Sequence, residues 1–233
     1  MTDINKHKFY LVQILKDIYS DSELSVSLGF KGGTALMFFY DLPRFSVDLD
    51  FNLLYPEKNN AVYKKLRKIA QKYGDIHDEA QKHYGNIIVL DYGINERKLK
   101  IEISNRWHND AYEIKNLLGI NVKTMTISNM FSHKLCALTD RGKVVNRDIF
   151  DCWFFMNRQT PLCQRIIKQR TNKNPSGYLQ DCIDTIDNLP DKSLLDGLGD
   201  LVSPGIKKFV RNKLRTEVIN LLRFYKDFPI LDS

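Results

Sequence analysis

The stretch that most constrains the fold runs from residue 45 to residue 51, where apolar and polar residues alternate strictly. A period of two is typical of a β-strand, because successive side chains point to opposite faces. The apolar face holds Phe45, Val47, Leu49 and Phe51, and the polar face holds Ser46, Asp48 and Asp50. We therefore expect a strand with one buried face, from whose other face two aspartates project side by side.

This aspartate pair is the first candidate functional feature. Two like charges at such a spacing repel, and each carboxyl group resists ionisation unless something compensates. A divalent cation compensates well, since Mg²⁺ prefers hard oxygen ligands and commonly takes one or two carboxylates together with substrate phosphates. Asp48 and Asp50 are therefore predicted metal ligands. The alternative is a solvent-facing edge strand that carries two hydrated aspartates.

Two adjacent glycines, Gly32 and Gly33, precede this strand. Because glycine has no Cβ atom, the backbone there can approach a phosphate closely. A short helix is expected over residues 34–42 with Thr34 as its N-cap, so its free N–H groups and positive end would face the same anion. A glycine turn, a helix start and an aspartate pair together are suited to holding a metal-bound triphosphate.

A third carboxylate is expected from a neighbouring strand. Residues 86–93 and 97–104 read as the two strands of a hairpin, and Glu102 lies between two isoleucines in the second. Glu102 is therefore a candidate for the base that takes a proton from an attacking hydroxyl, or for a second metal ligand. The alternative is an exposed glutamate on a half-buried strand.

The order of the predicted elements indicates an α+β fold class. Amphipathic helices, a short strand candidate at residues 24–30 and the strands described above fill the front of the chain, and the pattern turns helical from about Thr126. We expect a core domain over residues 1–122 and a helical domain over residues 123–233. Helices are predicted over residues 8–23, 59–74, 128–141 and 145–158.

Charge favours an anionic partner. The 233 residues carry a formal net charge of +7 and a sequence pI near 9.1. Such an excess suits nucleic acid or phosphate-bearing substrates, although solubility alone explains it as well.

The cysteines and the apolar residues argue for the cytoplasm. The cysteines are widely spaced and form no zinc pattern, and the apolar neighbours of the first two indicate buried, reduced thiols. No apolar signal core begins the chain and no run of about 18 apolar residues crosses it, so neither export nor membrane insertion is predicted. The cysteines are Cys136, Cys152, Cys163 and Cys182.

Two motifs in order resemble the AbiEii/AbiGii-type nucleotidyltransferase toxins, which include MenT-like toxins and belong to the DNA polymerase β-like nucleotidyltransferase superfamily. The first resembles K-G-G-T-x-L followed by R-x-S-x-D-x-D, and the second resembles K-L-x-A-L-x-x-R followed by R-D-x-x-D. The first is met by Lys31, Gly32, Gly33, Thr34, Leu36, Arg44, Ser46, Asp48 and Asp50. The second is met by Lys134, Leu135, Ala137, Leu138, Arg141, Arg147, Asp148 and Asp151.

The resemblance implies a fold and a set of residue roles. The fold is a polymerase-β-like core, a mixed sheet with helices, followed by an all-helical C-terminal bundle. Asp48 and Asp50 would hold Mg²⁺, or Mn²⁺ in its place, and Lys134 would meet the triphosphate. Asp148 or Asp151 would support the site. The nucleotide-binding residues would be Lys31, Gly32, Gly33, Thr34, Arg44, Ser46 and Arg141.

Helical spacing is consistent with the roles in the second motif. Lys134 and Arg141 can share one helix face, and Asp148 and Asp151 share a face of the next helix. One of the two carboxylates would orient Lys134 or a substrate hydroxyl, and the other would be structural. The alternative is an ion network with Arg147, Arg141 or Lys143.

The resemblance also implies a biological role. Family members are toxins of bacterial toxin–antitoxin or phage-defence (abortive infection) modules, and a cognate antitoxin from the same operon restrains them. Some are similar to tRNA-modifying enzymes that add nucleotides from an NTP to the acceptor 3′ end and so stop translation. Two alternatives remain: transfer to a small molecule or a protein hydroxyl, or a catalytically dead module that only binds RNA or a partner.

Overall fold

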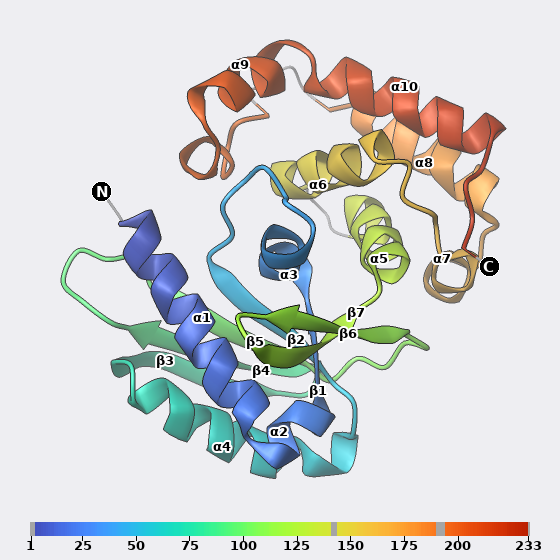
Figure 1. The fold of residues 1–233 in the computed structure, drawn as a ribbon. Coiled ribbons are helices and arrows are strands. Elements are labelled where there is room, and N and C mark those ends of the chain that lie inside the picture. The colour runs from blue at the N-terminus through green and yellow to red at the C-terminus, as the bar shows by residue number, and fades with distance from the viewer. Residues whose placement is uncertain (1–2, 141–143, 190–193, 233) are drawn as a thin grey trace. The chain divides into compact units, whose positions relative to one another are not determined.

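A computed structural model describes residues 3–140, 144–189 and 194–232 (Figure 1). The chain forms two compact units. The first comprises Met1–Asp41, Phe45–Trp107 and Tyr112–Met125, and the second comprises Leu42–Arg44, His108–Ala111 and Thr126–Ser233. Within the described ranges, no helix combines the length and the apolar character needed to cross a membrane.

The first unit is built on a seven-stranded mixed sheet with the order β3-β4-β5-β2-β1-β7-β6. Strand β2 pairs in parallel with β5, β1 pairs in parallel with β7, and the other neighbours are antiparallel. The mixed sheet with helices is therefore confirmed. The strands are β1 (Leu28–Lys31), β2 (Asp48–Leu53), β3 (Asp75–Lys82), β4 (Gly85–Asp91), β5 (Leu99–Ser104), β6 (Tyr112–Leu117) and β7 (Ile120–Met125).

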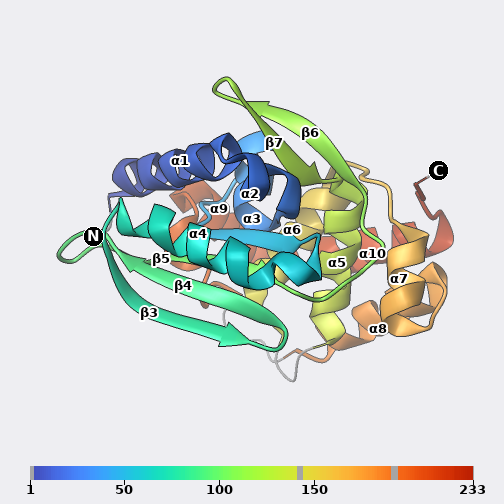
Figure 2. The ribbon, with the colours of Figure 1, turned by 90° about the horizontal axis from the view of Figure 1, so that it is seen from below.

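Helices α1 (Ile4–Ser20) and α4 (Asn59–Gln71) lie side by side and pack against the sheet (Figures 1 and 2). The predicted alternation explains the packing, since Leu49 and Phe51 of β2 are fully buried on one face, whereas Asp48 and Asp50 on the other face are only half-buried. Shorter helices complete the unit: α2 (Ser22–Ser27), η1 (Pro56–Lys58) and α3 (Gly32–Phe39).

Two local predictions for this unit are wrong. Residues 24–27 of the strand candidate belong to helix α2 and only residues 28–30 lie in β1, because the Asp21 carboxylate accepts hydrogen bonds from the backbone N–H groups of Glu23 and Leu24 and so caps the helix. Helix α3 begins at Gly32 and ends at Phe39, so Thr34 is its third residue and not its N-cap. The predicted hairpin is confirmed as β4 and β5.

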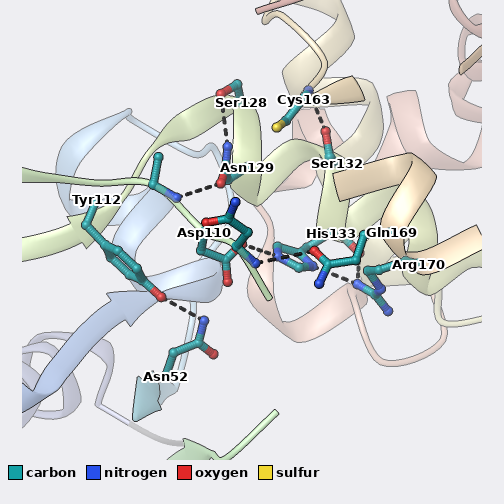
Figure 3. Close-up of polar contacts among 12 residues, drawn as sticks. Asn52, Asp110, Tyr112, Ser128, Asn129, Ser132, His133, Cys163, Gln169 and Arg170 are labelled. Carbon is teal, nitrogen blue, oxygen red and sulfur yellow. Dashed lines mark hydrogen bonds and ion pairs between the residues drawn. The ribbon is translucent and has the colours of Figure 1, made fainter. Parts of the chain in front are cut away.

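The side chain of Tyr112 on β6 reaches Asn52 on β2 (Figure 3). A Cβ atom on Gly29 of β1 would lie 2.1 Å from a ring carbon of Tyr112, so only glycine leaves room for this ring. The Tyr112 hydroxyl accepts a hydrogen bond of 2.9 Å from Nδ2 of the buried Asn52, which faces the same side as Asp48 and Asp50. Tyr112 thus ties the edge strand β6 to the centre of the sheet.

The second unit consists mainly of helices. Phe131 and Phe155 stack at 5.0 Å between ring centroids, and Tyr225 meets Phe131 edge-on, which forms an aromatic core. An isolated parallel bridge joins Leu162 to Leu231.

Whether residues 123–233 make one all-helical bundle stays a prediction, as does the domain boundary. The helices are α5 (Ile127–Thr139), α6 (Asn146–Asn157), α7 (Gln164–Thr171), α8 (Pro175–Asp187), η2 (Gly199–Leu201), α9 (Pro204–Asn212) and α10 (Leu214–Asp227). All four cysteines are buried and free, as predicted.

A histidine anchors residues 108–111 within this unit (Figure 3). Nε2 of His133 on α5 lies 2.6 Å from an Asp110 carboxylate oxygen, and Nη1 of Arg170 lies 2.8 Å from Nδ1 of His133. A guanidinium only donates, so Nδ1 accepts and Nε2–H donates, which corresponds to a neutral imidazole. The side chain of Asn129 accepts from the backbone N–H of Ala111 at 2.8 Å and holds the end of the same segment.

Candidate active site

The aspartate pair lies on the sheet face opposite to Leu49 and Phe51. Asp48 and Asp50 project from the same face of β2, and the register pairs Asp50 with Lys31 of β1 and with Glu102 of β5. Asp48 is paired with Lys100 of β5 in the same way. The strand neighbour predicted to carry Glu102 is therefore the strand beside the aspartates.

Repulsion and burial act together on Asp50. Desolvation raises the pKa of the Asp50 carboxyl to about 6, and the negative charges of Asp48 and Glu102 add to the increase. Lys100 offsets part of this charge, because its ammonium lies 2.8 Å from a Glu102 oxygen and 3.8 Å from an Asp48 oxygen. An acid whose pKa is raised in this manner would gain from a nearby cation.

Gly32 packs directly against the Asp50 carboxylate. It has φ of +81°, a conformation that glycine adopts at little cost, and a Cβ atom there would lie 2.5 Å from Oδ2 of Asp50. The predicted proximity of the glycine turn and the aspartate pair is therefore present. Because Gly32 has no Cβ atom, the Asp50 carboxylate has room to lie against its backbone.

Replacing Gly32 with alanine is expected to destabilise the protein by about 2–4 kcal/mol, because backbone strain adds to steric overlap with Asp50. Gly119 is a matched control: its φ is +88°, and nothing lies within 4 Å of a Cβ atom built on it. Gly119→Ala should therefore cost only about 1–2 kcal/mol. Urea unfolding of both variants measures the difference, and equal losses would contradict a tight contact between Gly32 and Asp50.

Other residues of the first motif support this arrangement. The Thr34 side chain is fully buried, and its hydroxyl donates a 2.5 Å hydrogen bond to the Asp48 carbonyl oxygen, which holds β2 against α3. Gly33 is buried in the first turn of α3, and Ser46 is buried just before β2. Their predicted contacts with a nucleotide stay predictions.

The donor set suits a hard divalent cation in part. Asp48 and Asp50 offer carboxylate oxygens on one face, and a bound cation would offset the desolvation and the repulsion that raise the pKa of Asp50. Glu102 is engaged by Lys100, and among the described residues no three His, Cys, Asp or Glu side chains gather closely enough to hold a metal ion. The pair fits Mg²⁺ that is also bound by phosphates, whereas ligation by Glu102 stays a prediction.

The second motif forms a buried charge cluster within the helical unit. Arg44 donates from Nε and Nη2 to the two Asp151 carboxylate oxygens at 2.6 and 2.7 Å. Nζ of Lys134 lies 2.9 Å from Asp151 and 2.7 Å from Asp148. The predicted contact between these carboxylates and Lys134 is present, and Arg44 is a further partner of Asp151. The alternative was an ion network with Arg147, Arg141 or Lys143. Arg141 and Lys143 lie outside the described residues.

Each charge in this cluster stabilises its neighbours. Burial alone would raise the pKa of the Asp151 carboxyl, but the positive charges of Arg44 and Lys134 outweigh burial and lower it. Burial likewise disfavours the Lys134 ammonium, yet the carboxylates of Asp151 and Asp148 raise its pKa. Asp151 and Lys134 are therefore both ionised at neutral pH.

Two features of these sites are not among the predicted residues. Lys100 lies two positions before Glu102, so the period of a strand placed it on the same face, and this signal was available in the sequence. The pairing of Arg44 with Asp151 spans 107 positions, and no local pattern indicates such a contact.

Comparisons with known proteins agree with this description. Residues 13–210 match the sequence model of the family described as nucleotidyl transferase AbiEii toxin, type IV TA system. No curated protein matches the chain by sequence. The fold is similar to that of JHP933 from Helicobacter pylori, with a TM-score of 0.65 and 21% identity over 98% of this chain and 94% of that chain. It is also similar to a crystal structure from H. pylori described as a candidate nucleotidyltransferase, with a TM-score of 0.63 and 20% identity over 96% and 94% of the two chains.

At these identities the two structures establish likeness of fold alone, whereas the family match spans most of the chain and includes both motifs. The chain therefore belongs to the AbiEii nucleotidyl transferase toxin family of type IV toxin–antitoxin systems.

Proposed function

We propose that the protein is a Mg²⁺-dependent nucleotidyltransferase that moves a nucleotide from an NTP to an acceptor hydroxyl, and that a cognate antitoxin restrains it. The single observation that carries this proposal is the position of Asp48 and Asp50, which share a strand face beside Gly32 with the pKa of Asp50 raised to about 6. When bound, the metal supplies positive charge to the triphosphate and to these carboxylates.

The chain's own residues orient the substrates and stabilise charge. Lys31, Gly32 and Gly33 would contact the phosphates from the start of α3, where backbone N–H groups are free of helical partners. The acceptor oxygen forms a bond to the α-phosphorus while the bond from that phosphorus to the pyrophosphate oxygen breaks. Glu102 is the proposed base for the acceptor proton, and its carboxylate is 43% exposed beside Asp50.

The helical unit contributes Lys134 in this proposal. Its buried ammonium, fixed by two carboxylates, would bind the triphosphate without losing its charge. Asp151 binds both cations of the cluster and is assigned a structural role, whereas Asp148 contacts Lys134 at 2.7 Å and is proposed to orient it. Arg44 faces Asp151, so the proposed role of this arginine is to support Lys134 through that carboxylate.

The finer parts of the proposal rest on the family resemblance. They are a polymerase-β-like core over residues 1–122, a helical bundle over residues 123–233, tRNA 3′ ends as acceptors, a cytoplasmic location and a part in abortive infection. The basic helix α4 gives RNA binding little support, because Lys65, Arg67 and Lys72 are already paired with carboxylates.

Incubation with each α-labelled NTP tests the activity, with Mg²⁺ present or removed by chelator, and with RNA, protein and small molecules supplied as separate acceptor pools. Label that appears in RNA only when Mg²⁺ is present is the expected result. Label in protein or in a small molecule would mean that the acceptor is not RNA. No label in any pool would favour a catalytically dead module that only binds RNA or a partner protein.

A further inference from the structure

Exposed aromatic and cationic side chains gather where the β3–β4 turn meets the end of β5. Tyr84 is 62% exposed and Trp107 is 67% exposed. The Arg106 guanidinium lies 5.1 Å from the centroid of the Tyr84 ring, and the His83 ring meets the same ring edge-on at 4.6 Å. Trp107 directly follows Arg106 in the chain, and we call His83, Tyr84, Arg106 and Trp107 the aromatic cluster. Single exposed aromatics are ordinary, but a group of them with a guanidinium indicates a binding surface.

The backbone holds this cluster in place. The N–H of Asn105 donates to the Tyr84 carbonyl oxygen at 3.0 Å, which joins the turn to the segment after β5. The N–H of Arg106 donates to the Ser104 hydroxyl at 3.3 Å. Tyr84 and Arg106 therefore present their ring and guanidinium plane from a scaffold of two hydrogen-bonded strands, at little entropic cost.

The cluster continues the strand that carries Glu102. The register pairs Glu102 with Ile87 and Ser104 with Gly85, so the sheet face with the carboxylates leads along β4 and β5 toward the turn. Arg106 follows Glu102 by four residues, which is about 13 Å at the rise of an extended chain. A few unpaired nucleotides span such a distance, and a small-molecule acceptor does not.

We propose that Tyr84, Arg106 and Trp107 stack the unpaired bases of a single-stranded nucleic acid whose 3′-hydroxyl is the acceptor. This inference rests on the proposed nucleotidyltransferase function and assigns to the aromatic cluster the contact with the unpaired part of its acceptor. Every base has a π-face, so aromatic rings and guanidinium planes bind unpaired bases with little sequence preference. The cluster contains no carboxylate, and the exposed Lys82 beside it adds positive charge for the phosphates.

Fluorescence of Trp107 tests the stacking without any catalysis. The other tryptophan, Trp153, is removed by Trp153→Phe in the full chain, so that Trp107 alone reports. Titration with an unlabelled octanucleotide of RNA, the same sequence as DNA, and the matching duplex is carried out at one salt concentration without NTP. Both single strands, or RNA alone, are expected to quench the signal, and the duplex much less. RNA-only binding would show that the 2′-hydroxyl is also recognised. Equal binding of the duplex, or no binding, would overturn the inference.

Substitutions in the aromatic cluster distinguish stacking by the Tyr84 ring, stacking by the Arg106 guanidinium plane, and the effect of the Arg106 charge. Tyr84→Ala is expected to weaken binding about tenfold, the loss of one base stack, and Tyr84→Phe to retain it within about twofold. Arg106→Lys keeps the charge but removes the plane, so weakened binding there supports stacking. Phe9→Ala, at another exposed aromatic, is the matched control with no expected change. Unchanged binding by Tyr84→Ala would overturn the inference.

Different results would contradict the proposed binding surface and the proposed enzymatic activity. Asp50→Asn should bind the single strand as the parent does, since binding here needs no catalysis. If binding depends on Tyr84 but no nucleotide transfer is found, the proposed activity is contradicted and the proposed binding surface is supported. If Tyr84→Ala transfers nucleotides to RNA with an unchanged KM for the RNA, the proposed binding surface is contradicted and the proposed activity is supported.

Discussion

Asp50→Asn is expected to abolish nucleotide transfer and, in the nucleotide-free protein, to increase stability above pH 6. Asparagine has nearly the same shape but no charge, so it removes a predicted metal ligand together with the repulsion from Asp48 and Glu102. Loss of transfer by about 10³-fold or more is expected, comparable with the removal of a main electrostatic contact in other active sites.

The stability gain has a defined pH dependence. Because the pKa of Asp50 is raised from 3.8 to about 6 by folding, ionisation is less favourable in the folded protein than in the unfolded chain. The wild-type protein therefore loses stability as pH rises from about 4 to about 6. Asp50→Asn lacks this loss, so its advantage grows over the same window to about 1–3 kcal/mol.

Urea unfolding from pH 4 to pH 8, with and without Mg²⁺, measures the effect. Added Mg²⁺ should stabilise the wild type and leave Asp50→Asn unchanged. Asp78→Asn is the matched control, because Asp78 is exposed on the edge strand β3 and should tolerate the change in both assays. Transfer retained by Asp50→Asn would contradict the mechanism, and a less stable Asp50→Asn would contradict the electrostatic account of the site.

The parts of the fold that sequence reasoning predicted are those with a local, periodic signal. Strand β2 alternates between a buried and an open face, and helix α4 buries Val62, Leu66 and Ile69 at helical spacing. In contrast, β3 is exposed along most of its length, so it carries no apolar alternation, and the edge strand β6 was missed for a similar reason. Edge strands gain their structure from pairing with a neighbour, and a single sequence does not display that pairing.

The candidate site shows the same difference between contacts that are local in the sequence and contacts that are long-range. Asp48, Asp50 and Gly32 lie close in the sequence, and their proximity followed from one strand and one turn. Arg44 belongs to the same motif, yet its guanidinium is bound by Asp151, far along the chain. Such long-range ion pairs depend on tertiary packing, so no local pattern indicated this partner, and the contact of Arg44 with a nucleotide stays a prediction.

Asp151→Asn is expected to destabilise the protein by about 3–5 kcal/mol, the largest stability loss among these predictions, because the buried Arg44 guanidinium then faces a neutral amide and the half-buried Lys134 keeps only the Asp148 carboxylate. The Asp151 side chain has no exposed surface, and Arg44 and Lys134 are 3% and 22% exposed. For a chain of this size the melting temperature should fall by about 6–20 °C. Thermal unfolding followed by circular dichroism measures the change.

Asp148→Asn is the matched comparison on the same helix. Lys134 keeps Asp151 as a partner in this variant, so we expect a smaller loss of about 1.5–3 kcal/mol, typical of one charged hydrogen bond. Nucleotide transfer should nevertheless fall, because Asp148 is proposed to orient Lys134. Equal destabilisation by the two variants, or full activity in Asp148→Asn, would contradict the division of roles between the carboxylates.

Acid provides an independent measure of the Asp151 contribution. The pKa of Asp151 is lowered from its ordinary value of 3.8, so the stability that this carboxylate supplies is present above pH 4 and is lost as pH falls further. The gap between the wild type and Asp151→Asn should therefore narrow below pH 4. A gap that stays constant down to pH 2 would mean that packing around residue 151, and not its charge, holds Arg44 and Lys134 in place.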